Sequence, residues 1–328
     1  MASLKDNETK LQVLELNGRD LTRQAIANIV DIPVSTVKDF LDKRTYKQWW
    51  DNYGPHEGKI DISNLLEGKG PKILTLDIET APIQAGVWGL WQQNVGLNMI
   101  ENDWYILSWC AKWYHETEVM YMDKRDSWNT EDDKDILIAI HKLLDEADII
   151  ITQNGKKFDE KKLNARFVLN GMKPPSKCRH IDTCLVARRH FGFTSNKLEY
   201  MTDKLCKTYK KLKHGRFPGF ELWKECLSGN MEAWQEMEEY NIHDVLSLEE
   251  LYDILRPWMN NHPNVNVYYD DNKFRCSCGS EELEHSGYAY TNLSKFDRFT
   301  CQDCGTEVRG RVNLLPKEKQ ETLKSNIM

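Results

Sequence analysis

Acidic side chains at three separate places in the chain could act together in holding metal ions. Asp77 and Glu79 end an apolar run, and the two-residue period of a strand puts both on one face. Asp159 follows a second apolar run, at the predicted start of a helix. Asp244 lies on a long predicted helix, four residues after Tyr240 and on the same helical face. Carboxylate oxygens are the ligands that Mg²⁺ prefers, so such acids can hold a divalent ion, although each alone could also be a solvated acid or a helix cap.

Apolar periodicity indicates the elements that carry these acids. Strands are predicted over 72–78, 105–113, 118–123 and 148–153, and helices over 131–146, 158–169 and 231–255. The alternation of strands and helices favours the α/β class. Asp77 and Glu79 then lie at the end of the first strand, and Asp159 and Asp244 lie on the helices 158–169 and 231–255.

The order of the motifs is more specific than any one of them. The chain carries D-x-E at Asp77, then N-x3-F-D from Asn154 to Asp159, then Y-x3-D from Tyr240 to Asp244. This order resembles the three exonuclease motifs of the DEDD superfamily, over residues 72–256. The tyrosine fits the subtype found in the proofreading domains of family B DNA polymerases and in stand-alone phage exonucleases, since the histidine subtype would need a histidine where Glu239 stands.

The resemblance implies a fold and a metal content. It implies an RNase H-like mixed sheet flanked by helices, and two Mg²⁺ or Mn²⁺ ions held by four carboxylates. Asp77 would bridge the two ions, Glu79 and Asp244 would complete the site on the nucleophile side, and Asp159 would hold the second ion.

The resemblance also implies a reaction. Tyr240 would orient the attacking water, while Phe158 and Asn154 would contact the end of the nucleic acid. We therefore expect a 3′→5′ exonuclease acting on DNA, with single strands preferred. Two alternatives stay open: an exoribonuclease of the same fold, and a non-catalytic, sequence-specific DNA-binding adaptor.

The net charge of −7 hides a strong segregation of charge. Residues 153–217 hold 17 Lys and Arg against 5 Asp and Glu, a local net of 17 − 5 = +12, so the other residues carry −7 − 12 = −19. We expect the densest basic run to contact the phosphate backbone beside the acids, although such a run can also be a solvated face. The run comprises Lys204, Lys207, Lys210, Lys211, Lys213 and Arg216.

Four of the nine cysteines are grouped in two short motifs near the C-terminus. The motifs are Cys276-x-Cys278 and Cys301-x2-Cys304, each followed by a glycine. Four thiolates can close a tetrahedral zinc site, so this pattern predicts one structural Zn²⁺ in a small zinc ribbon. The five remaining cysteines are interpreted as ordinary buried thiols.

Punctuation by Gly and Pro divides the chain into four parts. We predict a helix-turn-helix-like unit over 1–50, a linker over 51–71, the exonuclease domain over 72–262 and the zinc ribbon over 263–328. Neither a secretory signal nor a membrane span is evident, so the cytoplasm of a bacterial or phage-infected cell is expected. Expected partners are DNA, with RNA as the alternative, and a replication or recombination protein, but no membrane.

Overall fold

The computed structural model describes residues 13, 23–30, 32–41, 70–127, 129–212 and 215–326. The chain divides into two compact units, each considered by itself below. The first unit comprises Met1–Gly70 and Asn264–Glu281, and the second comprises Pro71–Pro263 and Glu282–Met328.

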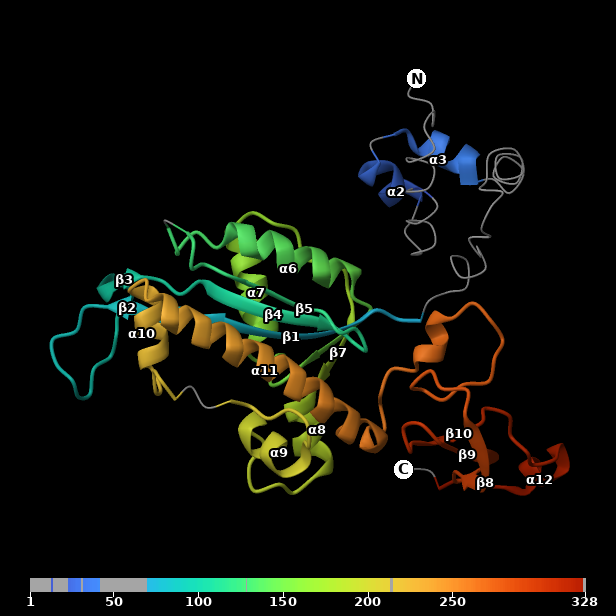
Figure 1. The fold of residues 1–328 in the computed structure, drawn as a ribbon. Helices are drawn as coiled ribbons and strands as arrows, with labels where there is room; N and C mark the ends of the chain where they lie inside the picture. The colour runs from blue at the N-terminus through green and yellow to red at the C-terminus, as the bar shows by residue number, and fades with distance from the viewer. Residues whose placement is uncertain are drawn as a thin grey trace. The chain divides into compact units, whose positions relative to one another are not determined.

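The second unit is built on a five-stranded mixed sheet with the strand order β5-β4-β1-β6-β7 (Figure 1). The central strand β1 (Ile73–Thr80) is antiparallel to β4 (Ile106–Trp113) and parallel to β6 (Ile149–Thr152). The outer strands are β5 (Val119–Asp123) and β7 (Arg179–Asp182). With helices on this sheet, the predicted α/β, RNase H-like fold class is confirmed.

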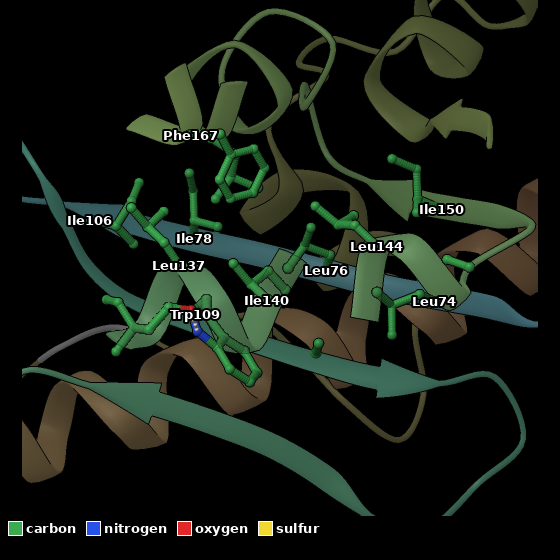
Figure 2. Close-up of a cluster of buried hydrophobic side chains, with 14 residues drawn as sticks. Leu74, Leu76, Ile78, Ile106, Trp109, Leu137, Ile140, Leu144, Ile150 and Phe167 are labelled. Carbon is green, nitrogen blue, oxygen red and sulfur yellow. Dashed lines mark hydrogen bonds between the residues drawn. The ribbon is translucent and has the colours of Figure 1, made fainter. Parts of the chain in front are cut away.

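One face of the sheet packs against α6 (Lys134–Glu146) and α7 (Asp159–Leu169). Figure 2 shows the apolar side chains of this layer, in which Leu76 and Ile78 of β1 meet Ile140 of α6 and Phe167 of α7. The alternation of β1 buries these residues on the helix-covered face. The alternate residues of β1, Asp77 and Glu79, therefore face the opposite side of the sheet.

The long helix α11 (Met231–Leu255) contacts β1 and β4 and carries a second apolar cluster with α10 (Glu221–Leu227). Helix α11 begins where the Asn230 side chain accepts a 3.0 Å hydrogen bond from the Glu232 amide, which satisfies one of the first helical N–H groups. Buried Trp234 and Met237 then anchor the first half of the helix. Helices α8 (Thr183–His190) and α9 (Leu198–Leu205) contact α11 further along.

An apolar loop projects between the short strands β2 (Gln84–Ala85) and β3 (Ile100–Asn102). A hydrogen bond of 3.0 Å from the Gly86 amide to the Met99 carbonyl closes its base. At its tip, the side chains of Trp88 and Trp91 are 98% and 84% exposed.

The C-terminal part of the second unit is a small three-stranded antiparallel sheet. It consists of β8 (Leu283–Tyr290), β9 (Lys295–Cys301) and β10 (Glu307–Arg309), followed by the short helix α12 (Lys317–Thr322). This sheet fits the small C-terminal unit expected from the cysteine motifs. Short 3₁₀ turns cover Leu97–Met99 (η1) and Arg256–Trp258 (η2) in the same unit.

The first unit contains α2 (Arg23–Ile29), α3 (Val34–Leu41) and the 3₁₀ turn η3 (Val265–Tyr268). Ile26 of α2 packs with Val37 and Phe40 of α3 in one buried cluster. Two short helices occur where the helix-turn-helix was predicted, but that assignment and the domain boundaries remain predictions. Most of the predicted linker, 51–69, lies outside the described residues. Within the described residues, no helix has the length and apolar character needed to cross a membrane.

Candidate metal-dependent active site

Three acidic residues predicted from the sequence meet on the α11 side of β1. The carboxylate oxygens of Asp77, Glu79 and Asp244 include atoms that all lie within 4.8 Å of one another. Strand alternation gives Asp77 and Glu79 their common direction, and α11 crosses the strand at the position of Asp244. The three side chains form a cluster that could hold a metal ion.

The fourth predicted acid reaches the same place from α7. The Oδ1 atom of Asp159 accepts a 3.2 Å hydrogen bond from the backbone amide of Ile78, between Asp77 and Glu79 on β1. Only 2% of Asp159 is exposed. The first turn of α7 thus brings a buried carboxylate against the strand that carries the other two. The four acids are called the acidic cluster below.

Asn241 orients one member of the acidic cluster, and sequence reasoning missed it. Its Nδ2 atom donates a 2.9 Å hydrogen bond to Asp77, and its Oδ1 atom accepts one of 2.6 Å from the Ser108 hydroxyl. Asn241 is fully buried, so each end of its amide has a defined partner. The only available sequence signal was its place between Tyr240 and Asp244, on the α11 segment that faces β1.

Burial and mutual repulsion change the protonation of the acidic cluster. Burial, with the nearby charges of Asp159 and Asp244, raises the pKa of Asp77 well above its ordinary range. Burial and the charge of Asp244 raise the pKa of Glu79 to about 8. Burial raises the pKa of Asp159 to about 7, although backbone hydrogen bonds oppose the rise. A positive charge placed among these acids would reverse the shifts, because it favours the ionised form.

Lys211 supplies one such charge from within the chain. Its Nζ atom donates a 2.6 Å hydrogen bond to the Tyr240 hydroxyl and also pairs with the carboxylate of Asp244. Burial lowers the pKa of Lys211, but attraction to Asp244 and Tyr240 outweighs this effect and holds the pKa above its ordinary range. Burial, followed by the charges of Asp244 and Glu79, raises the pKa of Tyr240. The phenol is therefore protonated at neutral pH.

A pocket, called the candidate pocket, opens over the acidic cluster. Two other predicted residues, Asn154 and Phe158, line it together with the acids and with residues of the segment 184–199. Asn154 has a φ of +64°, and its amide donates a 2.9 Å hydrogen bond to Asp182. Asp182 also accepts from the amides of Lys156 and Leu185, which makes it the N-cap of α8 rather than a member of the acidic cluster.

The predicted basic run is distributed among different partners. Lys204 and Lys210 pair with Asp203 at 3.2 and 3.3 Å, and Arg216 pairs with Glu236 at 2.8 Å. In this run, Lys211 alone is among the described residues that line the candidate pocket. Lys207 is exposed, and Lys213 lies outside the described residues. Nucleic-acid binding by this run remains a prediction.

The two C-terminal cysteine motifs lie in different units, Cys276 and Cys278 in the first and Cys301 and Cys304 in the second. The amide of Gly279 donates to the carbonyl of Cys276, and that of Gly305 donates to the carbonyl of Cys301, each at 3.0 Å. Both glycines have positive φ, +98° and +72°, which explains why glycine follows each motif. The partners Cys278 and Cys304 directly precede these glycines.

A comparison with protein families bears on the fold of the central domain. Residues 94–256 match the family model described as the RNase_H superfamily, which is consistent with the mixed sheet flanked by helices. The matched segment includes Asp159 and Asp244, whereas Asp77 and Glu79 precede it on β1.

Among solved structures, the chain is similar to the family B DNA polymerase from the hyperthermophilic archaeon Pyrobaculum calidifontis. The identity is 14%, the match covers 57% of this chain, and the TM-score is 0.42. The match spans 25% of that polymerase, or about a quarter of its length. No curated protein matches this chain.

Proposed function

We propose that this protein is a metal-dependent 3′→5′ exonuclease that hydrolyses phosphodiester bonds of DNA, with single strands as the preferred substrate. The observation that carries the proposal is the convergence of Asp77, Glu79 and Asp244 within 4.8 Å, with Asp159 buried against the same strand. An RNase H-like domain that gathers four acids in one pocket supports a nuclease, and the motif order favours the exonuclease type.

The residues of the acidic cluster fit Mg²⁺ or Mn²⁺. Their donors are all carboxylate oxygens, and the raised pKa values of Glu79 and Asp159 mark a site whose negative charge Lys211 does not fully offset. Asp77, Glu79 and Asp244 would hold one ion, and Asp77 with Asp159 would hold a second. When bound, a pair of divalent ions supplies an activated hydroxide and neutralises the leaving 3′-oxygen.

Other side chains of the candidate pocket would position the substrate and the water. Tyr240 keeps its proton, so its hydroxyl can donate a hydrogen bond that orients the attacking water. Phe158, 37% exposed at the pocket, offers a ring on which a terminal base can stack. Asn154 lines the same wall and would contact the strand end.

We propose one structural Zn²⁺ for the four C-terminal cysteines. Thiolate is a soft ligand that Zn²⁺ accepts and Mg²⁺ does not, so the two metal groups of the chain would select different ions. A site with four protein ligands leaves no open position for a substrate, which fits a structural and not a catalytic role.

The test is hydrolysis of end-labelled oligonucleotides with Mg²⁺ or Mn²⁺ by the wild type and by the variants Asp77→Ala and Asp244→Ala. We expect the wild type to shorten single-stranded DNA from its 3′ end and both variants to lose this activity while keeping a folded far-ultraviolet spectrum. Glu232→Gln is the matched control, because Glu232 is an exposed acid at the start of the helix that carries Asp244. Undiminished hydrolysis by both alanine variants would falsify the proposal.

Matched RNA and duplex substrates separate the alternatives in the same assay. Preferential degradation of RNA would identify an exoribonuclease, since the same carboxylates can support hydrolysis of either DNA or RNA. Sequence-specific binding of duplex DNA without hydrolysis would identify the non-catalytic adaptor. Labels placed in turn on the two strand ends establish the direction of degradation.

A further inference from the structure

A basic and aromatic surface continues the wall of the candidate pocket beyond the acidic cluster. Arg188 in the last turn of α8 lines this pocket, and the chain returns to the pocket wall at Ser195. The residues between these two points combine cations with rings. The α8 exit surface is defined here as Arg188, Arg189, Phe191, Phe193 and the neighbouring Trp258.

The three rings of the α8 exit surface pack against one another, two of them stacked and the third edge-on. The rings of Phe191 and Phe193 are nearly parallel, with an interplanar angle of 13° and centroids 4.9 Å apart. Trp258 meets Phe191 edge-on at 5.5 Å, and 61% of Trp258 is exposed. Neither phenylalanine is fully buried, so the stack presents aromatic surface to solvent. Bases stack on exposed aromatic side chains whatever their sequence.

The arginines of the α8 exit surface differ from the predicted basic run in whether acids of the chain pair with them. In the basic run, Lys204 and Lys210 form ion pairs with Asp203, and Arg216 forms one with Glu236. Within the part of the chain that the structure describes, no ion pair joins Arg188 or Arg189 to an acid, and both side chains are exposed. Their charge is therefore available to a phosphate group from outside the chain.

We infer that the α8 exit surface is the track along which a single-stranded nucleic acid reaches the candidate pocket. The inference rests on the proposed function, because a strand whose 3′ end lies at the acidic cluster must leave the pocket along one of its walls. The arginines would bind phosphates, and the three rings would stack on bases upstream of the cleaved bond. This combination of cations and rings matches the chemistry of a single strand, which exposes both its phosphates and the faces of its bases.

The two kinds of contact can be told apart by their dependence on salt. Each phosphate contact with a single strand contributes about −0.7 to the slope of log K against log salt. The double variant Arg188→Gln/Arg189→Gln should therefore flatten the slope by about 1.4. Trp258→Ala removes an uncharged stacking partner, so it should weaken binding about fivefold or more and leave the slope unchanged.

Binding is measured by fluorescence anisotropy with oligothymidylates of about twelve and three nucleotides, without added Mg²⁺ or Mn²⁺. The loss caused by Trp258→Ala should occur with the longer strand and be small with the trinucleotide, which the candidate pocket alone can hold. Lys134→Gln/Lys142→Gln on α6 is the matched charge control, because α6 covers the face of the sheet opposite to the one that carries Asp77 and Glu79. Trp88→Ala is the matched tryptophan control, because Trp88 is exposed in the β2–β3 loop.

The α8 exit surface would be rejected as the track if its variants bound the longer strand with wild-type affinity and slope, or if the wild type bound no single strand. If the wild type binds single strands but hydrolyses none of them, the proposed function is wrong and the track still stands. A wild type that hydrolyses DNA, with variants that bind like the wild type, defeats the track alone.

Discussion

Asn241 Nδ2 lies 2.9 Å from Asp77 Oδ2, and this hydrogen bond joins the middle of α11 to the acid at the centre of the acidic cluster. The Ser108 hydroxyl in turn fixes the orientation of the Asn241 amide from β4. A buried helix residue thereby orients a carboxylate of the acidic cluster.

We expect Asn241→Ala to raise the Mg²⁺ concentration needed for half-maximal hydrolysis by about 10- to 100-fold, because partners of metal ligands orient those ligands. Ser108→Ala removes only the support of Asn241 and should have a smaller effect. Titration of activity against Mg²⁺ measures both, with far-ultraviolet spectra as the folding control. Equal Mg²⁺ requirements in wild type and Asn241→Ala would show that Asp77 is oriented without this amide.

The raised pKa values of the acidic cluster predict how stability changes with pH. Glu79 has an ordinary pKa of 4.5 and a folded pKa of about 8, so its stabilising contribution is present below pH 4.5 and is lost as the pH rises through 8. Asp159 behaves alike, from 3.8 to about 7. Protein dialysed free of Mg²⁺ should therefore have a Tm that falls over this window.

Added Mg²⁺ should raise the Tm more at the upper end of that window, because the ion replaces protons on the acids. Thermal unfolding across the pH range, with and without Mg²⁺, measures both effects. Glu79→Gln should reduce the slope, whereas Glu232→Gln should keep it. A Mg²⁺-free Tm that rises from pH 5 to 8 by the same amount in all three proteins would contradict the prediction.

Lys211 is expected to stabilise the protein mainly when Mg²⁺ is absent. Lys211→Gln removes the partner of buried Asp244, which should cost up to about 3 kcal/mol in the free energy of unfolding without the ion. With saturating Mg²⁺ the cost should shrink, because the ion supplies the missing charge. Lys210→Gln is the control, since its exposed pair with Asp203 is screened by solvent and contributes little to stability. Denaturant unfolding in both conditions checks this, and a cost unaffected by Mg²⁺ would rule out the compensation.

The layer shown in Figure 2 predicts a sharp contrast along α6. Ile140→Ala, at a fully buried position, should lower the free energy of unfolding by about 2–5 kcal/mol. Ile138→Ala, at a position 41% exposed on the same helix, should change it by about 0.5 kcal/mol or less. Urea denaturation of the two variants measures the contrast, and similar losses would mean that α6 does not pack as described.

The cysteine group predicts a metal content that can be counted. Purified protein should carry about one Zn²⁺ per chain, and Cys276→Ser or Cys301→Ser should lower this content. Cys178→Ser is the control, because Cys178 is a half-buried cysteine outside the group. Elemental analysis after dialysis gives the ratio, and full zinc occupancy in both serine variants would argue against the assignment.

Regular elements of the fold were predictable from the sequence because their apolar residues follow the period of a strand or helix. The strands that became β1, β4, β5 and β6, and the helices that became α6, α7 and α11, were found within a few residues. The common direction of Asp77 and Glu79 followed from the same period.

The side-chain contacts that were not predicted depend on segments whose residues follow no strand or helix periodicity. The contacts of Lys211 with Tyr240 and Asp244 were not predicted, because the irregular chain after α9 that carries it folds back over α11. Its binding to phosphates stays a prediction. Asn241 gave only the weak signal of its place between Tyr240 and Asp244, since an asparagine inside a helix has many possible partners. The sequence Arg188-Arg189-His190-Phe191 does combine cations with aromatic rings, which is typical of a nucleic-acid-binding surface. The prediction followed the longer lysine run instead.

Among the described residues, the tryptophans of the exposed β2–β3 loop should differ in fluorescence from those of the buried core. Trp88 and Trp91 emit from water, whereas Trp109 and Trp234, 4% and 1% exposed, emit from the apolar interior at shorter wavelength. Residues 82–100 contain no charged side chain, so iodide is neither attracted nor repelled locally. Collisional quenching should therefore remove the long-wavelength emission first and leave the signal of the folded core.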